Sequence, residues 1–462
     1  MLRKNIFLLV AVFLFTGFAV QAQQIKPATT DTMTFSLQQA IEFSEQNNLN
    51  VKNAVLDLES AKKQVWEYTS MGLPQINGDA NYQNIFKVPL ISFGPQLDYS
   101  KLPSETPLTK QDFLNSLVDA GGLPLGVKEN VTWDLTVSQL IFSGQYLVGL
   151  QASRILKELS EQALTKSKFD TRSSVSQSYY LVLVSEEGLK ILKKSLDAVD
   201  KILEDMTAMN QQGLIESTDV DQIRINKTNI ENLVRSTSAS AQLAYRLLKF
   251  QLGLNLDQPI ALTDSLSELI DRSNFKLSLD NEFNINNNID YRIMMTQENL
   301  SLMNLKNQKS TFLPTISAVY RHQELLNKPE FNFNFPNMLQ VSLTLPIFSS
   351  GMRLARVGEA KIALEKTSNQ REMVQQNLTI GYQQAKINYN KAVNDYRSLK
   401  ENLALTEKVY NQTLVKYKEG VSSSLELTQA QNQYLTNESS YYNAILNLFN
   451  AKTALERLLA TE

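Results

Sequence analysis

Residues 351–420 carry the clearest periodic pattern in the sequence, an apolar seam whose positions step by four and three. No proline interrupts this stretch, and the seam consists of Leu378, Tyr382, Ala385, Tyr389, Ala392, Tyr396, Leu399, Leu403, Thr406, Tyr410, Thr413 and Tyr417. A seam that repeats every seven residues over several repeats is typical of a coiled coil. With its rise of 1.5 Å per residue, a helix of this length would extend roughly 100 Å.

The same spacing resumes after Gly420 and predicts a second helix that runs back along the first. Its apolar positions are Leu427, Tyr434, Tyr441, Leu448 and Leu455. Residues 419–425 are therefore predicted to form the tip of a helical hairpin, because glycine tolerates the left-handed backbone that ends many helices. Residues 212–218 are predicted to form a matching tip, with Gly213 in the same role and Ser217 as the N-cap of the next helix.

A period of two marks the candidate strands. Apolar residues alternate with polar ones in residues 339–347 and again in residues 131–138. Partner strands are predicted directly after Pro74 and Pro314, because proline disfavours helical backbone in the residue before it. Such alternation suits a strand between lipid and a watery lumen, and it equally suits a half-buried strand of a soluble sheet.

Three short matches, in the same order, divide the chain into two similar halves. The matched pairs are residues 73–76 with 313–316, Gly144 with Gly351, and Gly213 with Gly420. We therefore predict two homologous halves, residues 23–254 and 289–462, separated by an irregular segment, residues 255–288. The first half carries an insertion between its strands, a long loop at residues 87–130. Within it, one face of a predicted short helix carries Phe113, Leu114, Leu117 and Val118.

The number of strands predicts that the chain oligomerises. Each half supplies two strands, so one chain has four. The smallest common membrane barrels have about eight strands, and an open edge in lipid would leave backbone groups unpaired at a cost of several kcal/mol each. One chain therefore cannot close a membrane barrel alone.

The N-terminus is predicted to be a secretory signal peptide, residues 1–22. Arg3 and Lys4 precede an apolar stretch, residues 6–20, and small residues flank the expected cleavage position. A membrane anchor is the alternative interpretation, but a helix needs roughly 20 apolar residues to cross a bilayer. The mature chain is thus expected to leave the cytoplasm.

Composition limits the chemistry that the chain could perform. The net charge is −2, the sequence contains no cysteine, and His322 is the only histidine. Without a basic excess, no nucleic-acid partner is expected. The sequence also contains no His/Cys cluster, phosphate-binding glycine loop or nucleophile elbow. We therefore expect no catalytic residues, no metal site and no cofactor, and we predict that the protein is not an enzyme.

The doubled order of helix, strand pair, long helix, tip and helix resembles that of the TolC-type outer-membrane efflux proteins, over residues 34–459. The Leu-Pro and Phe-Ser-Gly junctions at Pro74, Pro314, Gly144 and Gly351 support the resemblance. It implies an α+β membrane protein: a homotrimer with a twelve-stranded outer-membrane β-barrel, four strands per chain, continued by a long periplasmic α-helical coiled-coil barrel. It also implies contact with outer-membrane lipid, and a periplasmic adaptor (membrane fusion) protein that connects the channel to an inner-membrane pump.

The resemblance further implies roles for residues at the tips, where channels of the family close like an iris. Asp219 and Glu426 each lie six residues after a tip glycine, and three subunits would bring six carboxylates to one constriction. Tyr417 matches a tyrosine of the family's gate contacts, whereas Ser422 stands in place of an arginine and Gln429 in place of a second acid. A simpler hypothesis is that both acids only complement helix dipoles.

The resemblance makes Gly213 and Gly420 candidate contact residues for the adaptor, although both would serve as helix C-caps in any case. The sequence thus predicts a passive conduit for the efflux of small molecules, located in the outer membrane and extending into the periplasm. One alternative is the exit duct of a type I protein secretion system. An alternative of another class is a trimeric coiled-coil structural or adhesin protein, which would have a single strand region at one terminus.

Overall fold

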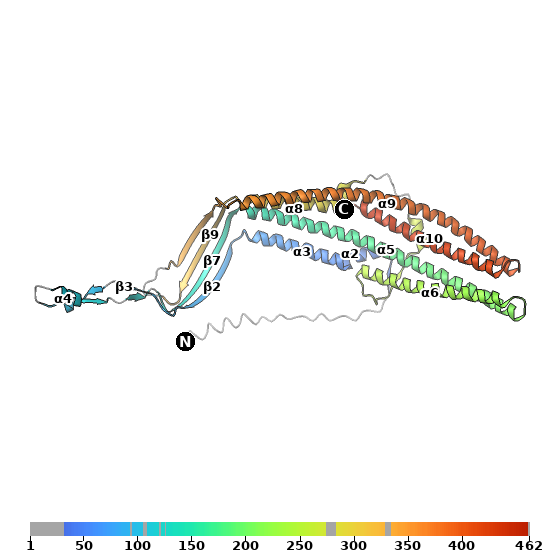
Figure 1. Ribbon diagram of the computed structural model, residues 1–462, viewed down its shortest axis with the longest axis horizontal. Coiled ribbons are helices and arrows are strands. Elements are labelled where there is room, and N and C mark those ends of the chain that lie inside the picture. Colours follow the sequence, from blue (N-terminus) through green and yellow to red (C-terminus); the bar gives the residue numbers. More distant parts are fainter. Residues whose placement is uncertain are drawn as a thin grey trace.

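The computed structural model describes residues 32–92, 95–104, 109–119, 122–124, 126–273, 283–328 and 334–460, and the predicted signal peptide lies outside these ranges. The molecule is a long rod, with its strands toward one end and the turns of two helical hairpins at the other (Figure 1). The two candidate functional regions, the sheet and the hairpin tips, therefore lie far apart along the rod.

Two very long helices run along the rod, α5 (Gly144–Gln211) and α9 (Met352–Lys418). They contain 68 and 67 residues, which corresponds to about 100 Å each at the rise of an α-helix. The length predicted from the seam of α9 is thus confirmed. Beyond the tips, α6 (Ser217–Leu252) packs back against α5, and α10 (Ser424–Leu459) packs back against α9.

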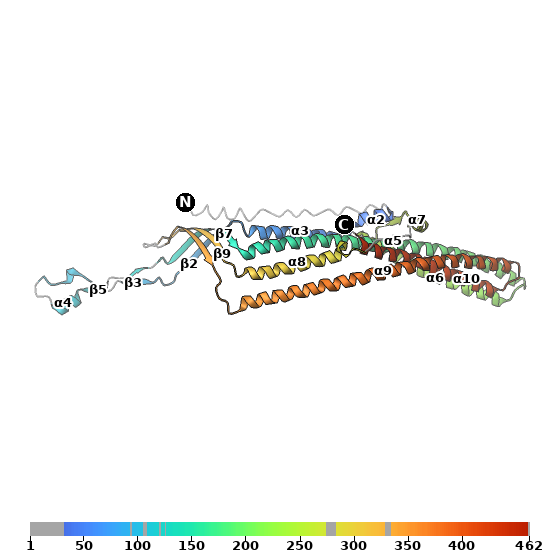
Figure 2. The same ribbon diagram turned by 90° about the horizontal axis from the view of Figure 1, so that it is seen from above.

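Shorter helices cover the part of the long helices nearer the sheet. α3 (Leu49–Ser70) packs on α5, and α8 (Ile289–Ser310) packs on both α5 and α9 (Figure 2). α2 (Leu37–Asn47) precedes α3 and also contacts α5. The irregular segment between the two halves contains α7 (Leu266–Arg272) and a short 3-10 helix, η2 (Ile285–Asn287).

The tyrosine seam of α9 serves packing. Ala385, Tyr389, Ala392 and Tyr396 are buried in the main core, to which α5 and α10 also contribute. A second cluster of buried residues, nearer the tips, contains Val199, Ile202, Met206, Val220, Ile223, Ile230 and Leu427. Both clusters contain residues of both hairpins, so hydrophobic burial also holds the two hairpins against each other.

Four long strands form one antiparallel sheet in the order β10-β9-β7-β2. The strands are β2 (Gln75–Asn84), β7 (Glu129–Ser143), β9 (Thr315–Leu325) and β10 (Asn337–Thr344). They occur where the period of two predicts them. β7 of the first half pairs with β9 of the second half, so the sheet joins the two halves and leaves β2 and β10 as its outer strands.

A small parallel ribbon lies beside the middle of α5, where β1 (Met33–Phe35) pairs with β8 (Ile260–Leu262). The fully buried Tyr179 of α5 supports it. The Tyr179 hydroxyl lies 3.0 Å from the carbonyl oxygen of Phe35 and 2.9 Å from a carboxylate oxygen of Asp264. One buried hydroxyl thus links the start of the described chain to the segment between the halves.

The insertion in the first half extends beyond the sheet as a narrow ribbon (Figure 1). It contains β3 (Leu90–Ser92) paired with β6 (Gly122–Pro124), β4 (Pro95–Leu97) paired with β5 (Leu117–Asp119), η1 (Tyr99–Lys101) and α4 (Lys110–Asn115). Part of the helix prediction is wrong. Phe113 and Leu114 lie on α4, but Leu117 and Val118 belong to β5. Pairing of Leu117 with Leu97 across the ribbon outweighs the helical spacing of these residues.

Candidate functional site: a two-faced sheet and a charged tip

The four-stranded sheet has one polar face, which its register defines. Directly opposed residues of antiparallel strands point to the same face. Thr132, Asp134 and Thr136 of β7 therefore share a face with their partners. These partners are Asn81, Asp79 and Asn77 on β2, and Leu325, Gln323 and Arg321 on β9. All of these partners except Leu325 are polar or charged.

The opposite face is apolar over most of its length. Trp133, Leu135 and Val137 of β7 lie on it, and their partners on β2 are Ala80, Gly78 and Ile76. The same face of β10 carries Leu339, Val341 and Leu343, which are 71%, 63% and 66% exposed. Such a row of exposed aliphatic side chains indicates contact with lipid or with another apolar surface. The alternation predicted for these strands is confirmed.

An ion pair crosses the polar face between β9 and β7. Arg321 donates to one carboxylate oxygen of the buried Asp134, through Nε at 2.8 Å and through Nη2 at 2.7 Å. His322 lies on the other face, where its Nδ1 is 2.8 Å from the side-chain oxygen of Asn337 and its ring packs edge-on against Trp133. The surroundings of this histidine are thus those of a packing residue.

The predicted junction prolines lie where two helices lead into the sheet. Pro74 follows α3 and directly precedes β2, and Pro314 follows α8 and directly precedes β9. The turn before β2 is fixed to the sheet, because the side chain of Gln139 donates to the carbonyl oxygen of Gly72 at 2.6 Å. The chain therefore enters the sheet at the same kind of turn in both halves.

The predicted junction glycines begin the two long helices, for different physical reasons. Gly144 starts α5 against the end of α8, and a Cβ atom there would lie 2.6 Å from Cδ1 of Leu313 and 3.1 Å from Cβ of Ser310. Gly351 is the N-cap of α9 and has a φ angle of 83°. Tight packing disfavours a side chain at the first position, and the left-handed backbone disfavours one at the second.

The tip glycines end α5 and α9 in matching left-handed turns. Gly213 and Gly420 have φ angles of 74° and 72°, and both turns lie at the same end of the rod (Figures 1 and 2). The predicted N-cap Ser217 is wrong, because α6 is capped by Glu216, without a side-chain hydrogen bond. In the second tip the N-cap is Ser423. In both tips the N-cap lies three residues after the tip glycine. The two turns therefore have the same length, and this length places Glu216, and not Ser217, at the N-cap position of α6.

Glu426 is hydrogen-bonded within its own tip. Its backbone N–H donates to the Ser423 hydroxyl at 3.2 Å, and its carboxylate accepts from the Ser423 backbone N–H at 3.2 Å and from the Ser422 hydroxyl. These hydrogen bonds, that from Ser422 foremost, lower the pKa of the exposed Glu426 carboxyl. Glu426 therefore completes a capping box with the N-cap Ser423 of α10, and it keeps its negative charge at neutral and mildly acidic pH.

Asp219 contacts the other hairpin instead. Its carboxylate accepts a hydrogen bond from the Ser424 hydroxyl on α10. Tyr417 of α9 is half-buried nearby, and burial, followed by the charge of Asp219, raises the pKa of Tyr417. Gln429 is exposed on α10. Asp219 thus contacts the second hairpin and acts on the pKa of Tyr417, whereas the hydrogen bonds of Glu426 described above stay within its own tip.

A second polar contact joins α6 to α10, one heptad farther from the tips. The side chain of Asn226 donates to the side-chain oxygen of Gln431 at 2.9 Å, and both residues are 2% exposed. This pair and the pair Asp219–Ser424 have the same separation in sequence, 205 residues. We name these two contacts the polar ladder. Sequence reasoning missed Ser424, Asn226 and Gln431, although polar residues seven positions apart beside an apolar seam could have indicated them.

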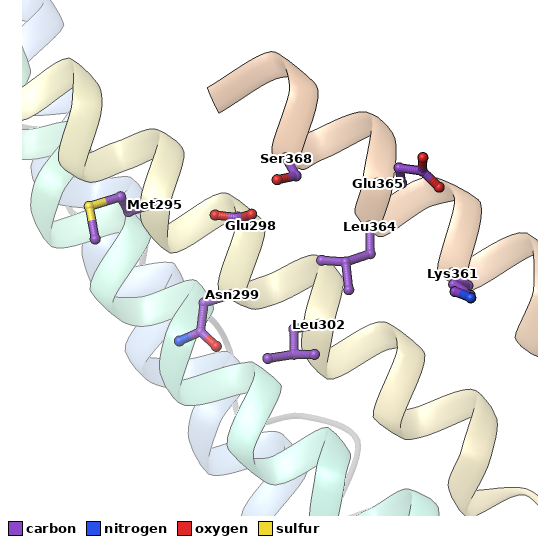
Figure 3. Close-up of a pocket in the computed structure, with 8 residues that line it drawn as sticks. All are labelled: Met295, Glu298, Asn299, Leu302, Lys361, Leu364, Glu365 and Ser368. Carbon is purple, nitrogen blue, oxygen red and sulfur yellow. The ribbon is translucent and has the colours of Figure 1, made fainter. Parts of the chain in front are cut away.

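A groove of about 600 Å³ lies between α8 and α9 (Figure 3). Met295 and Leu302 of α8 line it, and Leu364 of α9 extends toward α8 in the figure. Glu298, another lining residue, forms an ion pair with Arg371 of α9 at 2.8 Å. The groove therefore combines an apolar wall with a carboxylate that already has its partner, which is typical of a seam between two helices.

Within the described ranges, no group of three or more His, Cys, Asp and Glu side chains is arranged to hold a metal ion. In the same part of the chain, no helix has both the length and the apolarity needed to cross a membrane. The candidate functional features are thus the two-faced sheet at one end of the rod and the charged tips at the other.

Comparisons with known proteins agree with these features. Residues 286–461 match the family model described as outer membrane efflux protein, whereas no curated protein matches the chain. CusC, from a study of folding and transmembrane channel formation, is 16% identical, with a TM-score of 0.72 over 95% of this chain and 96% of that chain.

Two further solved structures have the same fold. The CmeC outer membrane channel of Campylobacter jejuni is 16% identical, with a TM-score of 0.69 over 92% of this chain and 85% of that chain. The outer membrane protein VceC of Vibrio cholerae is 15% identical, with a TM-score of 0.68 over 92% of this chain and 96% of that chain. The likeness therefore spans both halves of the chain.

These findings confirm the fold class predicted from the sequence and the resemblance to the TolC-type proteins. The sheet takes strands from both halves, which contradicts the alternative of a coiled-coil protein with a single strand region at one terminus. Residues 286–461 thus match the outer membrane efflux protein family, and the whole chain has the fold of solved outer-membrane channels.

Proposed function

We propose that three copies of this chain form a passive channel through which an efflux system exports small molecules. The observation that carries the proposal is the register of the sheet, which separates an exposed apolar face from a polar face that includes Asp79, Asp134 and Arg321. In a closed barrel, the apolar face would meet lipid and the polar face would line a water-filled lumen. Outside a membrane, the apolar face would be left in water.

The trimer is inferred from the outer strands. β2 and β10 each have a partner on one side only within the four-stranded sheet, and unpaired backbone groups in lipid cost several kcal/mol each. Pairing of β10 with β2 of the next copy would remove both edges. Three copies with four strands each would give a barrel of twelve, and the likeness to outer-membrane channels supports this assembly.

We also propose that the chain consists of two half-subunits, residues 23–254 and 289–462, linked by residues 255–288. The matching order of elements in the two halves supports this division. Each half has a strand pair that leads into a very long helix, and α5 and α9 differ in length by a single residue. In this correspondence β2 matches β9 and β7 matches β10, so each half supplies one outer and one inner strand of the sheet.

The tips are proposed to form the gated constriction of the channel. In this proposal, Asp219 and Glu426 supply the negative charge, and Ser422 holds Glu426 in place. Tyr417 belongs to the cluster around Asp219 that holds one hairpin against the other. Gln429 is exposed one turn beyond Glu426 and would face the same opening.

A periplasmic adaptor is the proposed partner at the same end. The turns at Gly213 and Gly420 are the outermost points of the two hairpins (Figure 1) and would present the tips to the adaptor. The adaptor would join the channel to a pump in the inner membrane, which would supply the energy for export. The channel itself would then need only to open and close.

Deleting the gene in its native host should raise sensitivity to some toxic compounds several-fold, because compounds that are normally exported would be retained. Growth inhibition across a panel of dyes, drugs and metal ions measures this effect, and a plasmid copy of the gene should reverse it. The set of secreted proteins should be compared in the same strains, which tests export of proteins. Unchanged inhibition and an unchanged set of secreted proteins would contradict the proposed channel function.

A further inference from the structure

The polar ladder has a residue at every seventh position of α10, first Ser424 and then Gln431. The next position at this spacing is Glu438. Like the two ladder residues of α10 before it, Glu438 is buried, with 7% exposure. At the sequence separation of 205 residues that defines the ladder, its counterpart on α6 is Leu233, which offers no polar atom. At the first two positions, a residue of α6 and a residue of α10 form a hydrogen bond. At the third position, the carboxylate of Glu438 has no polar counterpart on α6.

The carboxylate of Glu438 is only partly satisfied. Its Oε1 accepts a hydrogen bond from the Tyr434 hydroxyl at 2.8 Å. Its Oε2 is buried and has no hydrogen-bond partner in the described structure. A buried carboxylate oxygen without a partner is costly, unless a proton or a cation is supplied to it.

A cavity of about 590 Å³ lies beside Glu438, between α5, α6 and α10. Leu181, Leu192, Leu233 and Leu446 give it apolar walls. Its volume is in the range of small-molecule pockets, roughly 300–1,000 Å³. A mostly apolar pocket with one buried acid matches an organic molecule that has an apolar body and one positive charge.

Burial raises the pKa of Glu438. The titratable groups that face it are Glu187 and Lys194 of α5, Glu407 of α9, and Tyr434 and Tyr442 of α10. The part of α6 that lines the cavity is uncharged and consists of Asn229, Ile230, Leu233 and Thr237. With a raised pKa, Glu438 keeps its proton to a higher pH than an ordinary glutamic acid. A bound cation would displace this proton, so binding should strengthen as the pH rises through the raised pKa.

We propose that this cavity binds an organic cation, whose ammonium group donates a hydrogen bond to Oε2 of Glu438 while its apolar part packs against the leucines. The site would lie in the helical part of each subunit, away from the sheet and the hairpin turns. Binding at this site does not depend on the proposed channel function, and each can fail without the other.

The test is a fluorescence titration of the full-length protein in detergent with dansylcadaverine, a primary amine, and with its N-acetylated form, which is uncharged. The wild type should bind the amine roughly tenfold more tightly than the acetylated form, because only the amine can form a charge-assisted hydrogen bond. Glu438→Gln should abolish this preference and its dependence on pH. Glu401→Gln, which removes an exposed acid on α9 that does not act on Glu438, is the matched control and should bind like the wild type.

Leu233→Gln tests the site without removing the carboxylate. Its amide would complete the third step of the ladder and satisfy Oε2, so the amine should bind more weakly while the melting temperature is kept or raised. If Glu438→Gln does not fold, amine binding to Leu233→Gln tests whether the cavity binds the cation through Oε2 of Glu438. The proposal would be overturned by equal binding of the two probes, by wild-type affinity in Glu438→Gln, or by no saturable binding to the wild type. The last result is also expected if a neighbouring subunit fills the cavity.

Discussion

The Val341→Arg substitution should prevent most of the protein from reaching an assembled form in the outer membrane. Val341 lies on the apolar face of the outer strand β10 and is 63% exposed. If this face meets lipid, an arginine costs roughly 2–4 kcal/mol near the middle of the bilayer, and a trimer would carry three copies of it. Ser342→Arg places the same side chain on the polar face, where water in the lumen would solvate it. This second variant should therefore assemble nearly as well as the wild type.

The two variants form a matched pair, because they introduce the same residue at adjacent positions of one strand. The measurement is the amount of oligomer in outer-membrane fractions, resolved on gels without heating and compared with the wild type. Equal assembly of the two variants, or a larger loss for Ser342→Arg, would contradict the assignment of the two faces.

Replacing both tip acids, by Asp219→Asn and Glu426→Gln, should reduce the preference of the channel for cations several-fold while conductance changes less. The substitutions remove charge but can preserve the hydrogen bonds. An asparagine at the first position can still accept from the Ser424 hydroxyl, and a glutamine at the second can still accept from Ser422 and Ser423. A loss of selectivity would therefore report the charges themselves.

Reversal potentials in a salt gradient across a planar bilayer measure this effect. The control is Asp221→Asn, which removes a nearby acid of α6 that already pairs with Arg224 at 2.6 Å. The lowered pKa of Glu426 adds a second expectation: wild-type selectivity should persist into mildly acidic solution and decline as the pH falls through that lowered value. If the double variant and the wild type have the same reversal potential, the acids are helix caps only.

The fold could be predicted largely because its elements are long and strictly periodic. Twelve seam positions from Leu378 to Tyr417 specify the C-terminal part of α9, which ends at Lys418. A period of two distinguishes β7 and β10 from a helix. The insertion could not be predicted in the same way, because its elements are only three to six residues long. At such lengths, pairing with a neighbouring strand decides the conformation of Leu117 and Val118.

The tips were predicted only in part, for a different reason. Glycine readily adopts the left-handed backbone that ends a helix, so the positions of Gly213 and Gly420 alone were enough to predict both turns. Contacts between α6 and α10 depend on the register of two hairpins that are 205 residues apart in sequence, and no local pattern fixes that register. For this reason Asp219 could be singled out from the sequence, whereas its contact with Ser424 could not.

We propose that the four-stranded sheet of one chain closes only by pairing with other copies. The most direct measurement is the mass of the detergent-extracted, full-length protein by light scattering, with the contribution of detergent subtracted. We expect a single species of three protomers. A stable monomer with native secondary structure would contradict the account, because the edges of β2 and β10 would then have to exist unpaired in the membrane.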